Sequence, residues 1–360
     1  MQSTYDVLLK LLENTPLIWI VSAILLTIVS AIIVIIYSIA FFQGREISFW
    51  PPKIGKIVQE SLDIKKINKK ESRLPEIPTH SPYNPVDDNS RLNVQGSNNS
   101  FFDEVIFKKA LSLIKKKSDL VALDIGCADG FVTLDRFNKF ECFSKVYALD
   151  NNSTLVSIAK QKYENEKYVF HVANIETEEN ILSSFNHQGG VDFVFLSYTL
   201  HHLADPLVVL SKVKKIINPN GVLVVRSIDD GCKLFYSNNH ENSLNKTFNK
   251  LIELSNYEGD RSHGRKLYCQ LRLSGFNEIQ IHYQFKDTIK MSNQDRAKTF
   301  NESIAWRAEP IKSLLENGSL ELKKEYEWAV KAIESLESVF MHDDSLYYME
   351  TQHVAIASVE

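Results

Sequence analysis

The residues best suited to chemistry form a short run of small residues after a predicted strand. The run reads Asp124-Ile125-Gly126-Cys127-Ala128-Asp129-Gly130. Its glycines let the backbone turn sharply and approach a ligand closely, because they have no Cβ. The next predicted strand ends in Asp150, twenty residues after Gly130, where a carboxylate can accept two hydrogen bonds from a ribose diol. In an open parallel sheet, ligands bind outside the carboxyl ends of the strands. The pattern therefore predicts a site for a ribose-containing ligand.

The spacing of the glycines separates two classes of ligand. A dinucleotide site uses G-x-G-x-x-G to seat a pyrophosphate on a helix N-terminus. This loop has only G-x-x-x-G, which disfavours an NAD-dependent oxidoreductase. It resembles instead motif I of the class I S-adenosylmethionine-dependent methyltransferases, whose cofactor has no phosphate and needs room for a methionine moiety.

The resemblance to this family continues along the chain. Residues 172–175 follow the predicted third strand, where the family usually places an acid that accepts from the adenine amino group. Asn174 stands there instead, and its amide oxygen can still accept. Residues 191–206 resemble the family's fourth strand and following turn, and residues 218–221 the turn before its fifth strand. The resemblance implies S-adenosyl-L-methionine as the cofactor, bound by Asp124, Gly126, Cys127, Ala128, Gly130, Asp150, Asn151, Asn174, Ile175 and Ser197.

The catalytic candidates follow the predicted fourth strand. Methyl transfer from a sulfonium has a neutral leaving group, so the enzyme mainly has to hold an electron-rich acceptor about 3 to 3.5 Å from the methyl carbon. A general base matters only when the acceptor must lose a proton. Tyr198, His201 and His202 are the candidates for that role. In the resembled family such a histidine often caps a helix or packs beside the cofactor, and this structural role is the simpler interpretation of the pair.

The acceptor is predicted to be a small molecule or a lipid-linked molecule. Methyltransferases of nucleic-acid bases and protein amides typically carry an Asn/Asp-Pro-Pro-Tyr-like run after the fourth strand, whereas this chain has Leu196-Ser197-Tyr198-Thr199. The formal net charge of -4 provides no overall basic field for nucleic acid. Two charged loops, residues 226–233 and 259–265, are expected either to shape the acceptor pocket or to form ion pairs. Protein partners are not indicated by the sequence.

Two functions remain in competition at this point. The first is an active methyltransferase, and the second is a catalytically idle domain that binds S-adenosylmethionine as a sensor or scaffold. An idle domain would be favoured by a closed pocket or by the lack of a cavity for an acceptor. The intact motif I loop and Asp150 favour the enzyme.

Strands and helices alternate from residue 101 onward. Strands are predicted at 121–125, 145–150, 168–174, 191–198 and 221–228, and such alternation implies an α/β fold with a mostly parallel sheet. The family resemblance implies a Rossmann-like, seven-stranded class I methyltransferase fold, closed by antiparallel strands at 276–283 and 353–359. The segment 293–340 is predicted to be a helical insertion that serves as a lid or a partner surface.

The N-terminal part of the chain has a different character. Residues 17–42 form 26 residues without a charge, or roughly 39 Å as a helix, enough to span a bilayer. A cleaved signal peptide would be shorter and start with basic residues, so a retained transmembrane helix is the prediction. One Lys precedes the span, whereas eight Lys and Arg residues follow it before residue 74. The positive-inside rule then predicts a single-pass protein of the inner (cytoplasmic) membrane with its C-terminal part in the cytoplasm.

These observations divide the chain into four parts. We predict an N-terminal flank at 1–16, the transmembrane helix at 17–42, a juxtamembrane segment and flexible linker at 43–100, and the methyltransferase domain at 101–360. The cysteines have no metal-binding spacing, so neither a zinc site nor a disulfide framework is predicted; they are Cys127, Cys142, Cys232 and Cys269.

Overall fold

The computed structural model describes residues 45–49, 52–56, 89–238, 241–255 and 259–359. The chain divides into two compact units, residues 1–76 and 77–360. In the first unit, strands β1 (Arg45–Phe49) and β2 (Pro52–Lys56) form an antiparallel hairpin. The predicted membrane span at 17–42 lies outside the described residues. Within the residues that are described, no helix is both long and apolar enough to cross a bilayer.

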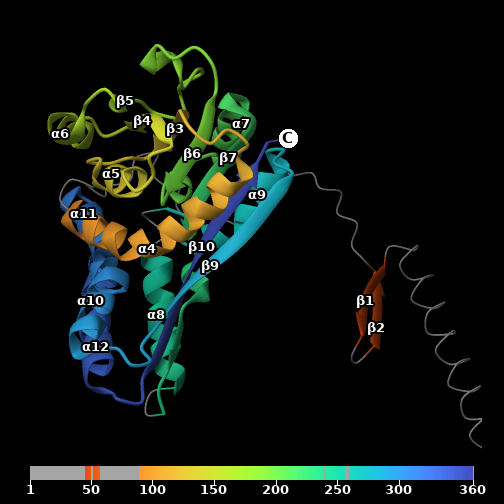
Figure 1. Ribbon diagram of the computed structural model, residues 1–360. Coiled ribbons are helices and arrows are strands. Elements are labelled where there is room, and N and C mark those ends of the chain that lie inside the picture. The colour runs from red at the N-terminus through yellow and green to blue at the C-terminus, as the bar shows by residue number, and fades with distance from the viewer. Residues whose placement is uncertain (1–44, 50–51, 57–88, 239–240, 256–258, 360) are drawn as a thin grey trace, which may run out of the picture. The chain divides into compact units, whose positions relative to one another are not determined.

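The second unit is built on an eight-stranded sheet with the order β5-β4-β3-β6-β7-β10-β8, in which β9 also pairs with β10. Neighbouring strands from β5 to β7 are parallel, and β10 runs antiparallel to its three partners. The Rossmann-like α/β fold with a mostly parallel sheet is confirmed (Figure 1). The strands are β3 (Leu120–Ile125), β4 (Phe143–Asp150), β5 (Tyr168–Val172), β6 (Val191–Ser197), β7 (Ile217–Ile228), β8 (Leu234–Tyr236), β9 (Glu278–Asp287) and β10 (Tyr347–Ser358).

The sheet has one strand more than the seven predicted. β10 begins at Tyr347, but its pairing with β7 begins only at Gln352. The short strand β8 pairs with Tyr347–Met349 and provides partners for backbone groups that β7 does not reach. Three residues are too few to show a hydrophobic period, so this strand could not be recognised in the sequence.

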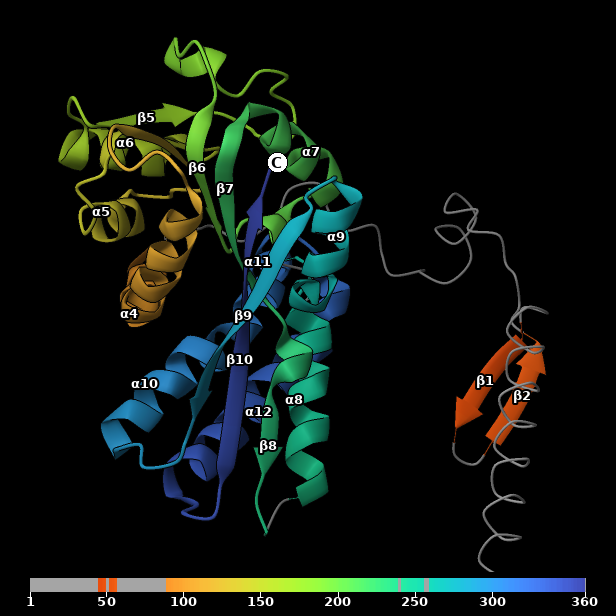
Figure 2. The same ribbon diagram turned by 45° about the vertical axis from the view of Figure 1, so that its right-hand side comes forward.

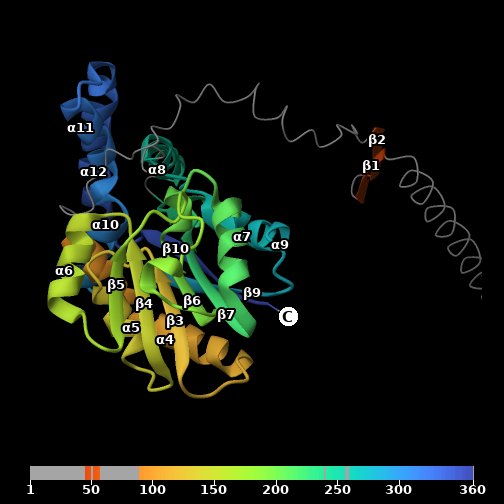
Figure 3. The same cartoon turned by 90° about the horizontal axis from the view of Figure 1, so that it is seen from above.

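Both faces of the sheet are covered by helices. Successive strand residues alternate between two cores, as the period of two for side chains requires; Leu123 and Ile125 belong to one core, and Ala122 to the other. The first core packs against α7 (Pro206–Ile216) and α9 (Leu267–Leu273). The second packs against α4 (Asn89–Leu113), α5 (Phe131–Phe137) and α6 (Ser153–Tyr163). Figure 3 shows the resulting layers from above.

Helix α4 begins earlier than the sequence indicated. The linker was predicted to run to residue 100 and the first helix to start at Phe101, whereas α4 starts at Asn89. Residues 89–100 have no apolar period, because their contacts are mainly polar: Asn99 is buried, and its side chain donates to the Tyr198 hydroxyl at 3.1 Å. Tertiary hydrogen bonds therefore support the first turns of the helix.

The segment between β9 and β10 is helical and contains α10 (Asn293–Ser303), α11 (Glu309–Glu316) and α12 (Lys323–His342). Together with α8 (Glu241–Ser255), these helices enclose a third core. Figure 2 shows α8, α10 and α12 beside the ends of β9 and β10 that project beyond the parallel strands. This arrangement places the helical segment next to the edge of the sheet where ligands bind.

Candidate active site

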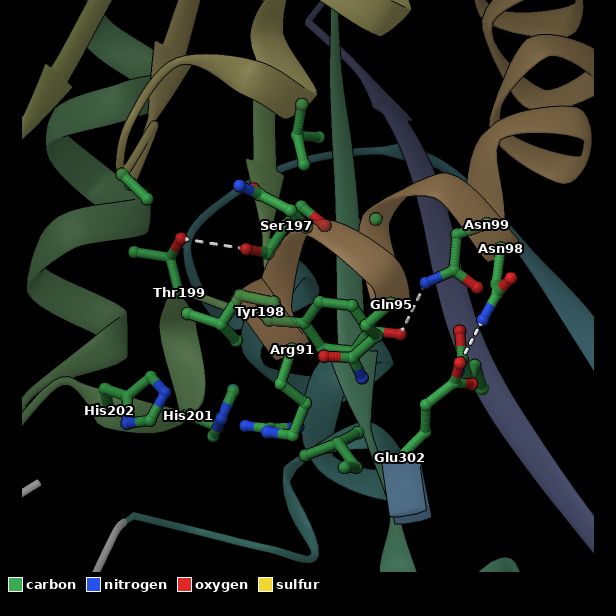
Figure 4. Close-up of a pocket in the computed structure, with 18 of the residues that line it drawn as sticks. Arg91, Gln95, Asn98, Asn99, Ser197, Tyr198, Thr199, His201, His202 and Glu302 are labelled. Carbon is green, nitrogen blue, oxygen red and sulfur yellow. Dashed lines mark hydrogen bonds between the residues drawn. The ribbon is translucent and has the colours of Figure 1, made fainter. Parts of the chain in front are cut away.

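A cavity of about 920 Å³ opens at the carboxyl ends of the parallel strands. The loops after β3, β4, β5 and β6 line one side, and the residues of α4, α10 and β10 line the other (Figure 4). Every predicted site residue except Gly130 lines this cavity. The topology therefore brings the cofactor candidates and the catalytic candidates into one pocket.

The loop after β3 is held in place by backbone hydrogen bonds. The N–H groups of Gly126 and Cys127 donate to the Leu149 carbonyl at 2.8 and 3.1 Å. Gly126 has a φ of 84°, and Ala128 has a φ of 48°, both in the left-handed region that favours glycine. The loop thus presents its backbone to the cavity in a conformation that few side chains tolerate.

Asp150 lies at the end of β4 and lines the cavity. Its Oδ2 accepts from the N–H of Ala128 at 3.0 Å, and its Oδ1 accepts from the N–H of Asn152 at 2.9 Å. Burial raises the pKa of Asp150, and these N–H donors oppose the shift. Each carboxylate oxygen has a further lone pair, so both can still accept a hydrogen bond from a ligand. Asn151 lines the cavity beside it.

Asp124 and Gly130 flank the loop that follows β3. Thr133 Oγ1 donates to Asp124 Oδ2 at 2.6 Å, and burial raises the pKa of Asp124 to about 7. Gly130 was predicted to bind the cofactor, but it does not line the cavity. A Cβ on this residue would lie 2.9 Å from the Phe170 ring. The left-handed φ of 80° and the close approach of Phe170 both favour a glycine here, and the role of Gly130 in cofactor binding stays a prediction.

The loops after β5 and β6 carry the remaining cofactor candidates. Asn174 is exposed, and its Oδ1 accepts from the N–H of Glu176 at 2.9 Å, which leaves one lone pair for a ligand. Ile175 is buried and presents an apolar surface to the cavity. Ser197 is partly buried at the end of β6, opposite the loop that follows β3.

The three catalytic candidates differ in their surroundings. Burial raises the pKa of Tyr198 to about 12, so its hydroxyl remains protonated at neutral pH. His201 is only 4% exposed, and its Nδ1 has no hydrogen-bond partner. Burial, with a smaller contribution from His202, lowers the pKa of His201. His202 is exposed, with its ring centroid 3.9 Å from that of His201. His201 therefore lies in the cavity wall as a neutral imidazole with an unpaired Nδ1.

The family of the chain follows from its match to a model of a known domain family. A model for a methyltransferase domain matches residues 116–300, more than half of the chain. The chain belongs to this family. The family is that of the class I S-adenosylmethionine-dependent methyltransferases, and S-adenosyl-L-methionine is its cofactor, as the sequence predicted.

Individual relatives are more distant. An uncharacterized methyltransferase of Schizosaccharomyces pombe is 25% identical over 141 residues, which cover 36% of this chain and 46% of that protein. The chain thus spans less than half the length of this curated relative. A putative methyltransferase of Bacillus halodurans is 15% identical with a TM-score of 0.43, covering 69% of this chain and 96% of that one. Phosphoethanolamine N-methyltransferase 2 of Haemonchus contortus, solved with S-adenosyl-L-methionine, is 15% identical with a TM-score of 0.41, covering 68% and 50%.

The residues of this methyltransferase domain fit the cofactor of the family. The partly buried Asp150 carboxylate has acceptor capacity for two ribose hydroxyls. The left-handed loop after β3 brings backbone close to the cavity where a methionine moiety would lie. Ile175 would provide an apolar contact for the adenine ring.

Helix α4 supplies site residues that the sequence interpretation missed. Asn89 and Asn93 donate to Asp129 Oδ2 at 2.8 and 3.0 Å, which fixes α4 against the cofactor loop of the methyltransferase domain. Asn98 bonds to Glu302 of α10, and Figure 4 shows this contact beside that of Asn99. The repeated asparagines, two of them four residues apart on one helix face, are the signal that could have identified this segment.

The two charged loops, residues 226–233 and 259–265, both form ion pairs and line the cavity. They form ion pairs, because Arg265 binds Asp229 through two nitrogens, at 2.6 and 2.9 Å. They also line the cavity through Lys233 and Arg261. The helical segment between β9 and β10 adds Trp306 to the same side of the cavity.

Proposed function

We propose that this chain is an active methyltransferase whose acceptor is a small or lipid-linked molecule. The observation that carries the proposal is a cavity of about 920 Å³ that joins Asp150 on one side with His201 and Trp306 on the other. Cavities of about 300 to 1,000 Å³ are typical of ligand sites. An idle domain that only binds the cofactor has no need of a lined space on the acceptor side.

The cofactor, Asp150 and His201 have separate roles in the proposed reaction. When bound, S-adenosyl-L-methionine supplies a sulfonium methyl group that an electron-rich acceptor atom can attack. Asp150 would hold the ribose hydroxyls. His201 would take the proton of an acceptor hydroxyl: its lowered pKa keeps the imidazole neutral, with a ring lone pair free to accept, and the same shift makes it a weaker base than an ordinary histidine. For an acceptor without a proton to lose, His201 would only help to shape the pocket.

The test supplies membranes and cell extract with methyl-labelled cofactor and the full chain, followed by metabolite and lipid profiling. We expect a labelled product in one of the two fractions. The variant His201→Gln should lower the rate at least tenfold if a proton is removed, since general base catalysis contributes about 10² to 10⁴. His342→Gln is the matched control, because His342 is exposed at the end of α12 and lines no part of the cavity.

Absence of any labelled product, with cofactor binding intact, would favour the idle sensor or scaffold instead.

We also propose that residues 17–42 anchor the methyltransferase domain in the inner membrane, with the domain in the cytoplasm. The support is the uncharged length of the segment and the excess of basic residues after it. A fluorescent reporter fused after residue 360 should be active, and alkaline phosphatase at the same position should be inactive, because the latter needs the periplasm. The reverse pattern would contradict the proposed orientation.

A further inference from the structure

Three residues with metal-binding side chains meet where β10 pairs with the end of β7. They are Asp229, directly after β7, Cys232, in the 3-10 helix η3 (Asp230–Cys232), and His353 of β10. A carboxylate oxygen, the thiol sulfur and a ring nitrogen of these residues lie within 4.8 Å of one another. The spacing of the cysteines does not predict such a group, because His353 comes from a distant strand that reaches β7 through its pairing with Ser227.

This cluster is separate from the cavity of the candidate active site. None of its three residues lines that cavity, whereas Ile228, Lys233 and Gln352, each adjacent in sequence to one of them, do. Successive residues of a strand point to opposite faces of the sheet, so His353 lies on the face opposite to Gln352. An ion bound by the cluster would therefore not touch the acceptor or the cofactor, but it would fix the chain that carries three residues of the cavity wall.

His353 has a buried nitrogen that lacks a partner. The residue is 7% exposed, and its Nδ1 has no hydrogen-bond partner among the residues that the structure describes. A buried polar atom of this kind calls for an explanation such as an ion. Gly264 keeps the space beside it open, because a Cβ there would lie 2.8 Å from His353 Nδ1 and 2.9 Å from Asp229 Cβ. The φ of Gly264 is outside the left-handed region, so this close approach, rather than the backbone conformation, favours glycine.

Asp229 already holds a cation, the guanidinium of Arg265. The carboxylate is fully buried, and it accepts from Arg265 Nη2 at 2.6 Å and from Arg265 Nε at 2.9 Å. The backbone N–H groups of Gly231 and Arg265 also donate to it, at 3.0 and 2.9 Å. A buried carboxylate is costly without a positive partner. The Arg265 side chain is 54% exposed, so it can turn into solvent when another cation takes its place.

We propose that Asp229, Cys232 and His353 bind a divalent transition-metal ion of the zinc type, which displaces the Arg265 guanidinium from Asp229. Zn²⁺ accepts thiolate, imidazole and carboxylate ligands together, whereas Ca²⁺ and Mg²⁺ take oxygen ligands. Bonds of about 2.0 to 2.3 Å place the ligand atoms of a tetrahedral zinc site roughly 3.5 Å apart, so the side chains have to approach by about 1 Å. The thiol proton passes to solvent when the metal–sulfur bond forms, and water completes the coordination.

Zinc titration of the chelator-treated full chain in detergent tests the proposal by calorimetry. We expect one Zn²⁺ to bind at the cluster and to raise the unfolding temperature, because a ligand that binds the folded state stabilises it. Co²⁺ in place of Zn²⁺ should give a sulfur-to-metal charge-transfer band in the absorption spectrum. Mg²⁺ and Ca²⁺ should leave the unfolding temperature unchanged, since a thiol and an imidazole are poor ligands for them.

Variants assign the ion to the cluster. Cys232→Ser and His353→Gln should each weaken Zn²⁺ binding at least tenfold, since loss of a partner outside the coordination shell already costs about 10- to 100-fold. Cys232→Ser should also remove the charge-transfer band. Cys269→Ser and His342→Gln are the matched controls, because both residues are exposed and outside the cluster. Cys232 is only partly buried, so Cys232→Ser keeps the test decisive if His353→Gln does not fold.

Arg265→Gln should have the opposite effect and tighten Zn²⁺ binding several-fold. The competing positive charge is then absent, while the new amide can still donate a hydrogen bond to Asp229. A carboxylate that serves only to hold Arg265 would not gain affinity for a metal in this variant.

Three results would overturn the inference. They are no Zn²⁺ binding by the natural chain, a charge-transfer band that survives in Cys232→Ser, and an Arg265→Gln chain that binds Zn²⁺ no more tightly than the natural one. The inference does not depend on the proposed methyltransferase function, because the cluster lies outside the cavity.

Discussion

Replacing Asp150 by alanine should weaken the binding of S-adenosylmethionine by well over tenfold. The carboxylate has acceptor capacity for two ribose hydroxyls, and hydrogen bonds to a charged group contribute about 1.5 to 3 kcal/mol each. The change also removes the acceptor for the N–H groups of Ala128 and Asn152, so the loop after β3 would lose a restraint. The fold should survive, because Asp150 lies at the end of a strand rather than in either core.

Calorimetry with S-adenosylmethionine and with NAD measures this effect. Asp344→Ala is the matched control, since Asp344 is exposed and does not line the cavity. The affinity of Asp150→Asn for S-adenosylmethionine should lie between those of Asp150→Ala and Asp344→Ala, because the amide keeps one acceptor oxygen and loses the charge. Unchanged affinity in Asp150→Ala, or tight NAD binding by the natural chain, would refute the assignment of Asp150 to the ribose of S-adenosylmethionine.

Gly126→Val should abolish measurable cofactor binding and lower the free energy of unfolding by about 2 to 5 kcal/mol. Two costs add up. The φ of 84° lies in the left-handed region, where a side chain costs about 1 to 2 kcal/mol. A Cβ would also lie 2.1 Å from Thr199 Oγ1, and such overpacking costs about 1 to 3 kcal/mol. The added side chain would therefore collide with the loop after β6 rather than fill the space for the methionine moiety.

Gly318→Val separates the backbone strain from the steric clash. Gly318 has a φ of 103°, but a Cβ there would have nothing within 4 Å, so only backbone strain should appear. Urea unfolding of both variants gives the comparison, and calorimetry gives the loss of cofactor binding. Equal destabilisation of the two variants would show that the contact with Thr199 has no energetic consequence.

The sequence by itself determined the parallel sheet and the cofactor side of the site. Strands such as Val191–Ser197 are continuous apolar runs, because both of their faces are covered by helices. Motif I and Asp150 could be recognised because a loop after one strand and an acid after the next are brought together by any parallel pairing of β3 with β4. These features depend on short-range pattern and on one topological rule. The predicted span at 17–42 likewise depends only on local hydrophobicity.

Only the tertiary structure shows which residues line the acceptor side of the cavity and where α4 begins. Asn89 is hydrogen-bonded to Asp129, forty residues away, and Asn98 to Glu302, 204 residues away. Arg307 meets Asp230 across 77 residues. These polar side chains form no apolar period of the kind that predicts a helix, and their partners become neighbours only after the sheet and helices have packed. Gly130 belongs to both groups: its φ of 80° favours glycine through the local backbone alone, whereas the approach of Phe170 to within 2.9 Å of the space that a Cβ would occupy exists only in the folded domain.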